Sequence, residues 1–163
     1  MGQEFDSIER NGANSLSVDF IRAAVAQYRS NQLQCTADNL GLEDAHSIWF
    51  DLPTLKKFIA DVENMARNVD ASVIDADLGV RMYYAAYPEN LEDISIKNEY
   101  HKLHTLIMIP TKKKENSVGE IVHYDYNPLI NSSDKRLALV TTKAMAQNHG
   151  SLAPPDSCEG ELY

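Results

Sequence analysis

The spacing of apolar residues changes once along the chain, and this change limits the possible folds more than any other feature. Between about residues 51 and 69, apolar residues recur at three- and four-residue intervals, as in a helix with one buried face: Leu55, Phe58, Ile59, Val62, Met65 and Val69. From about residue 78 they alternate, as in a strand: Leu78, Val80, Met82, Tyr84 and Ala86. The sequence therefore predicts helices first and strands afterwards.

Two helices are expected in the first half of the chain. The first covers about residues 17–33 and begins at a serine, which suits the N-cap position. A polar connection is expected over residues 32–41, which end in a glycine. The second helix begins after Asp51, a capping residue, and has Pro53 in its first turn, where proline is tolerated.

The predicted strands are short and follow one another without regular helical crossovers. They cover residues 48–50, 78–87, 105–110 and 120–126, and residues 137–142 form a last strand or a short helix. The lysine-rich stretch 112–116 is expected to be a solvated loop. This order predicts an α+β fold, in which two helices from the N-terminal half pack on one face of a mostly antiparallel sheet of about four to five strands.

Length and charge limit the class of protein. The 163 residues suit one domain, residues 1–163, with a loose leader over 1–16 and a proline- and glycine-containing tail over 148–163. Fifteen Lys and Arg against 24 Asp and Glu give a net charge of −9, which argues against nucleic-acid binding. The longest apolar run, 106–109, is too short to cross a membrane. Two distant cysteines and no signal peptide predict a reduced, cytoplasmic protein.

Strong catalytic signatures are absent from the sequence. It has no phosphate-binding glycine loop, no nucleophile elbow and no paired Cys-x-x-Cys motif, which lowers the expectation of an enzyme. Imidazole and carboxylate groups that could hold zinc or iron are scattered along the second half of the chain: His101, His104, His123, Asp125 and His149. Five histidines in such a chain are unremarkable, so no metal and no cofactor is predicted. Cys158 has a histidine nine positions earlier, which is weak support for a nucleophile.

The clearest candidate binding residues lie on the strand 78–87. Arg81 shares one strand face with Tyr83 and Tyr87, and an arginine between tyrosines suits an anionic ligand or an acidic group of a partner. Arg81 could instead pair with Asp75, Asp77 or Glu99, or this face could be the solvent side. His123 and Asp125 share a face of another predicted strand. With His149, these residues complete the predicted binding set: Arg81, Tyr83, Tyr87, His123, Asp125 and His149.

Several short motifs of the chain are similar to motifs of a group of small bacterial proteins. The motifs are Trp49-Phe50-Asp51-Leu52, Gly79-Val80-Arg81-Met82-Tyr83, residues 106–111, Asn148-His149-Gly150 and Pro154-Pro155. In this pattern the chain resembles a family of small uncharacterised Bacteroidetes-type proteins with a Gly-x-Arg-x-Tyr strand and a proline-rich tail. The resemblance implies a bacterial protein but no activity. Where such tails often carry a second cysteine, this tail has Cys158 alone.

Three functions are compatible with these observations. The first is a non-catalytic binding or assembly module, whose partner is an unknown protein or a second copy of the chain. The second is a small enzyme acting on an anionic substrate, with Arg81 binding the charge and His123 and Asp125 as acid–base groups. The third is an immunity or regulatory protein that neutralises a basic partner, which is suggested by the net charge alone. The sequence favours the first.

Overall fold

The computed structural model describes residues 15–89, 96–129 and 144–163. Its first element is a continuous helix made of α1 (Val18–Tyr28), a π-helical segment (Arg29–Leu33) and α2 (Gln34–Leu40). The remaining helix and the strands are β1 (Ser47–Trp49), α3 (Leu52–Val69), β2 (Leu78–Ala86), β3 (His104–Glu115), β4 (Ile121–Asp125) and β5 (Ser151–Ala153). No helix in these described ranges is both long and apolar enough to cross a membrane.

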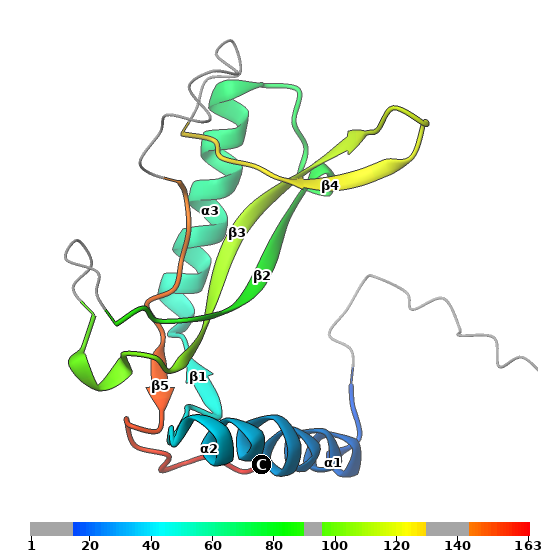
Figure 1. The fold of residues 1–163 in the computed structure, drawn as a ribbon. Helices are drawn as coiled ribbons and strands as arrows, with labels where there is room; N and C mark the ends of the chain where they lie inside the picture. Colours follow the sequence, from blue (N-terminus) through cyan, green and yellow to red (C-terminus); the bar gives the residue numbers. More distant parts are fainter. Residues whose placement is uncertain (1–14, 90–95, 130–143) are drawn as a thin grey trace, which may run out of the picture.

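The α+β class and the antiparallel pairing of the strands are confirmed. The five described strands divide between two sheets, a pair β1–β5 and a three-stranded sheet in the order β2–β3–β4. All three pairings are antiparallel. The long first helix lies across one end of the molecule, near β1, while α3 runs alongside β3 (Figure 1).

Helix α3 covers one face of the three-stranded sheet, as its apolar stripe predicts. Phe58 and Val62 of α3 are buried against Met108 of β3. The helix begins as expected, because the Asp51 carboxylate accepts a hydrogen bond from the Thr54 N–H at 2.8 Å. The predicted strands at 48–50, 78–87, 105–110 and 120–126 correspond to β1, β2, β3 and β4, whereas residues 137–142 lie outside the described residues.

The predicted connection over residues 32–41 is wrong, because the first helix continues to Leu40. Its polar residues bond to carbonyls of the preceding turn instead of breaking it: Thr36 Oγ1 donates to the Gln32 carbonyl at 3.1 Å, and Asn39 Nδ2 to the Cys35 carbonyl at 2.8 Å. Gly41, at φ +60°, then ends the helix in the left-handed conformation that glycine adopts without strain.

The predicted lysine loop at 112–116 is also wrong, because residues 112–115 extend β3. Their backbone pairs with β4, and two of the ammonium groups find carboxylates: Lys112 Nζ lies 3.1 Å from Asp70 Oδ2, and Lys113 Nζ 3.5 Å from Asp77 Oδ1. Paired in this way, lysines are compatible with a strand. The actual turn falls later, where Asn116 Oδ1 accepts bonds from the N–H groups of Val118 and Glu120.

The proline- and glycine-containing tail contributes the strand β5, which pairs with β1. Leu152 is fully buried and packs in a second core with Tyr87, Tyr100 and Leu103. Gly150 precedes β5 and lies against β1, because a Cβ at this position would be 2.5 Å from Ile48 Cγ2. The tail is therefore joined to the first half of the chain by close packing of the Gly150 backbone on the Ile48 side chain.

The contact at Gly150 gives the first testable prediction. Gly150→Ala is expected to lower the free energy of unfolding by about 1–3 kcal/mol, since the added methyl group would lie 2.5 Å from Ile48 Cγ2 and 2.9 Å from Phe50 Cζ. Ile48→Ala removes the closer of these two contacts, so the double variant is expected to lose less stability than the sum of the losses of the two single variants. Denaturation of the four proteins of this cycle in urea measures the coupling. Additive effects, within about 0.5 kcal/mol, would contradict the packing described here.

Candidate functional site

Four of the six predicted binding residues meet on one face of the three-stranded sheet. Arg81 Nη1 lies 2.5 Å from Asp125 Oδ1, and Nη2 donates to the backbone carbonyl of His123 at 2.7 Å. The Tyr83 hydroxyl donates to the other oxygen of Asp125. Arg81, Tyr83, His123 and Asp125 therefore form one cluster, called here the Arg81 cluster.

The register of the sheet explains how β2 reaches β4 across β3. Thr111 of β3 lies between Gly79 of β2 and Asp125 of β4, so these three residues share a face with Arg81. A Cβ at Gly79 would lie 2.9 Å from Thr111 Oγ1. The Thr111 side chain thus occupies the space that a Cβ at position 79 would need.

The Arg81 guanidinium is engaged within the protein. The hydrogen bond with Tyr83 and then the charge of Asp125 raise the pKa of Arg81 above its already high ordinary value. The side chains of Arg81 and Asp125 are each 41% exposed. An anionic substrate would have to compete with Asp125 for this cation. His123 contributes its backbone carbonyl to the cluster. The geometry is that of a satisfied ion pair on a partly exposed sheet face.

The other two predicted residues, Tyr87 and His149, lie together at a different place. Tyr87 is buried, stacks on Tyr100 with ring centroids 6.0 Å apart, and donates a hydrogen bond to the Asn148 carbonyl at 3.0 Å. His149 and Tyr87 line a shallow pocket of about 230 Å3 together with Lys97. The six predicted residues are therefore divided between two places and do not form a single cleft.

A hydrogen-bond network surrounds this second place. The Tyr100 hydroxyl donates to Asp156 Oδ2 at 2.6 Å, and Lys97 Nζ donates to Asp156 Oδ1 at 2.9 Å. Tyr100 also accepts from the Leu152 N–H at 3.2 Å, which ties the network to β5. These bonds, first that of Tyr100 and then that of Lys97, hold the pKa of Asp156 below its ordinary value. The network fixes the tail rather than presenting a reactive group.

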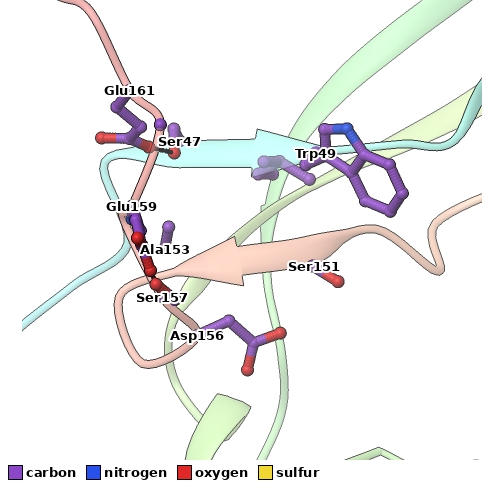
Figure 2. A pocket seen from close by; sticks show the side chains of 10 residues that line it. Ser47, Trp49, Ser151, Ala153, Asp156, Ser157, Glu159 and Glu161 are labelled. Carbon is purple, nitrogen blue, oxygen red and sulfur yellow. Dashed lines mark hydrogen bonds between the residues drawn. The ribbon is translucent and has the colours of Figure 1, made fainter.

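A third place, which the sequence analysis missed, lies where the tail crosses β1. A depression of about 560 Å3 is lined by both strands of the β1–β5 pair, by Asp156 and Ser157, and by residues 159–161. Figure 2 shows the Glu161 carboxylate beside Ser47, to which it is hydrogen bonded, with Trp49 at the other end of β1. Trp49 is 66% exposed. No sequence signal brings residues 46–49 to the tail, because their contact depends on the β1–β5 pairing.

The scattered histidines considered as metal ligands do not converge. His104 Nδ1 lies 2.5 Å from Asp44 Oδ2, while His123 and Asp125 belong to the Arg81 cluster and His149 to the Tyr87 pocket. Within the described ranges, a group of three ligand atoms with suitable spacing is instead made by His46, Cys158 and Glu161. Both cysteines, Cys35 and Cys158, are free and exposed.

The Asp156 network predicts a specific dependence of stability on pH. Because its folded pKa is depressed below 3.8, the charged Asp156 stabilises the fold above that value, and this contribution is lost as the pH falls through the lower folded pKa. Asp156→Asn is expected to lower the free energy of unfolding near neutral pH, and the gap to the unmodified protein should narrow below about pH 4. Urea denaturation across this range measures the gap.

The matched control is Glu159→Gln, which changes a carboxylate of the same turn that is not bonded to Tyr100 or Lys97. A gap between Asp156→Asn and the unmodified protein that stays constant as the pH falls would show that the charge of Asp156 does not stabilise the fold.

No protein-family model matches the chain, and neither a curated protein nor a solved structure matches it at a significant level. The resemblance to a Bacteroidetes-type family therefore stays a prediction. The function proposed below rests on the geometry of the described residues.

Proposed function

We propose that the protein is a non-catalytic assembly module, which self-associates by pairing β2 with the β2 strand of a second copy. The observation that carries the proposal is the outer edge of β2. In the part of the chain that the structure describes, this nine-residue strand pairs with β3 on one side and with no strand on the other. An unprotected strand edge of this length is a template for pairing with another chain.

The hydrogen bonds of β3 reveal which backbone groups of β2 face outward. The N–H and C=O groups of Met108 both bond to Gln147, and the Pro110 carbonyl accepts from the Tyr126 N–H at 2.8 Å. The backbone groups of the even-numbered residues of β3 thus point away from β2, toward Gln147 and β4, and those of its odd-numbered residues point toward β2. Since Arg81 pairs with Ile109, the residues of β2 that direct their backbone groups outward are Val80, Met82 and Tyr84.

The side chains of these same three residues are exposed and apolar. Val80, Met82 and Tyr84 are 40%, 55% and 95% exposed, respectively. Natural edge strands are usually protected by charges, prolines or bulges. The one charged residue of β2 is Arg81, and Asp125 neutralises it. The edge therefore presents both unpaired backbone groups and apolar side chains.

A second copy is the occupant that fits this edge because the strand is complementary to itself. Antiparallel pairing about Met82 sets Val80 opposite Tyr84 of the second copy, with two backbone hydrogen bonds at each outward-facing pair. The same register sets Arg81 beside Tyr83 of the second copy, whose hydroxyl binds Asp125. A cation of one copy thus faces the carboxylate-bearing cluster of the other, and the apolar side chains lie together on the opposite face.

The proposal includes a bacterial cytoplasmic location. The free, exposed state of Cys35 and Cys158 supports a reducing compartment, and the bacterial origin rests on the resemblance of the motifs. The alternative function, an enzyme that acts on an anionic substrate, is supported less, because Arg81 is already bonded to Asp125 and to the His123 carbonyl.

Cross-linking through an introduced cysteine tests the pairing and its register. In a Cys35→Ser/Cys158→Ser background, Met82→Cys is expected to form a disulfide-linked dimer on mild oxidation. The proposed pairing brings the two Cα atoms at position 82 to about 5.5 Å, within disulfide range. Non-reducing electrophoresis measures the linked fraction at micromolar protein.

Val80→Cys in the same background is the matched control. In this register the Cα atoms of the two residues at position 80 are about 14 Å apart, too far for a disulfide. Val80→Cys alone should stay unlinked, whereas Val80→Cys/Tyr84→Cys should link. Equal linking of Met82→Cys and Val80→Cys, or no linking of Met82→Cys, would contradict the proposal.

A further inference from the structure

We infer that His46, Cys158 and Glu161 form a binding site for a zinc ion, independent of the proposed self-association. Each residue offers one ligand atom, and the three atoms lie within 4.8 Å of one another. The site lies where the tail passes the start of β1, beside the depression of Figure 2. It includes none of the residues that the sequence analysis considered as metal ligands.

The spacing of the ligand atoms suits a tetrahedral ion. His46 Nε2 lies 3.7 Å from Cys158 Sγ, and a carboxylate oxygen of Glu161 lies within 4.8 Å of the other two ligand atoms. Bonds of about 2.0 Å to nitrogen and about 2.3 Å to sulfur place two ligand atoms of a tetrahedral zinc roughly 3.5 Å apart. A zinc ion therefore fits between the imidazole and the thiolate with little movement of either.

The chemistry of the three ligands selects the class of metal. A thiolate and an imidazole favour zinc or another borderline transition metal over magnesium and calcium, which prefer oxygen ligands. The cysteine and the glutamate are exposed, and His46 is partly buried. This exposure leaves a fourth position of the ion open to water or to a ligand atom of another molecule.

The fold holds the two halves of the site in place. The His46 N–H donates to the Ala153 carbonyl at 2.9 Å, which continues the β1–β5 pairing up to the ligand. Cys158 and Glu161 are brought to one side of the tail by a turn, in which the Glu161 N–H bonds to the Cys158 carbonyl at 3.2 Å. Gly160 has φ +94°, so this turn uses a conformation that other residues rarely adopt.

Arg29 determines which nitrogen of His46 is available. Its Nη2 lies 3.1 Å from His46 Nδ1 and 3.6 Å from Glu161 Oε2. This cation faces the Nδ1 side of the ring and leaves Nε2 toward Cys158. When zinc binds Nε2, the ring proton moves to Nδ1, and Arg29 keeps its contacts with Glu161 and with the Tyr163 carbonyl. The Cys158 thiol gives up its proton to bind zinc, so the affinity increases with pH.

Zinc alone, titrated into the full chain, tests the site. Equilibrium dialysis with elemental analysis should find one zinc per chain in the unmodified protein and in Cys35→Ser, which removes the other exposed thiol. Cys158→Ser and His46→Gln should each weaken zinc binding by at least about tenfold, since each removes a ligand. Co²⁺ in place of zinc should give a thiolate charge-transfer band that Cys158→Ser abolishes.

The variants differ in one residue each at exposed or partly buried positions, so circular dichroism should show that they remain folded. Binding by Cys158→Ser that equals that of the unmodified protein would overturn the inference. So would an unmodified protein that retains no zinc after dialysis, or a cobalt spectrum that is lost with Cys35 rather than with Cys158.

Discussion

The pairing of β3 with strands on both of its sides is the interaction on which the rest of the three-stranded sheet depends. As the central strand, β3 carries Met108 into the core beneath α3. It also fixes the register that places Asp125 in one row with Gly79, so that Arg81 meets a carboxylate across the sheet. The same hydrogen-bond pattern turns the backbone groups of Val80, Met82 and Tyr84 outward. The position of β3 thus brings the residues of the Arg81 cluster together. In the described part of the chain it also leaves the outer edge of β2 without a strand partner.

The β1–β5 pair positions the tail, as β3 positions the strands on either side of it. Because Gly150 allows close approach to Ile48, β5 lies against β1. This pairing brings the tail to His46, the residue that precedes β1. The Asp156 network fastens the tail on one side, and Arg29 reaches it from the long helix, donating to the Tyr163 carbonyl at 2.9 Å. The candidate zinc ligands come together as a consequence, although His46 and Cys158 are 112 positions apart.

Local sequence patterns predicted most of the helices and strands. The contacts that depend on pairing between distant strands could not be predicted from the sequence. The stripe and the Asp51 cap determine α3 within its own sequence, and alternation identifies β2. The lysines of β3 looked like a loop because their carboxylate partners, Asp70 and Asp77, lie 42 and 36 positions earlier. The sequence placed Arg81 and Asp125 on strand faces, but their contact depends on register. His46 carries no local pattern that would point to the tail.

Amide hydrogen exchange at β2 tests the central claim, the pairing of this edge with a second copy, most directly. The account predicts that the amides of Val80, Met82 and Tyr84 become protected as the protein concentration rises. The amides of Arg81 and Tyr83, which face β3, should be protected at every concentration. Outward amides that exchange at the same fast rate across the whole concentration range would contradict the account.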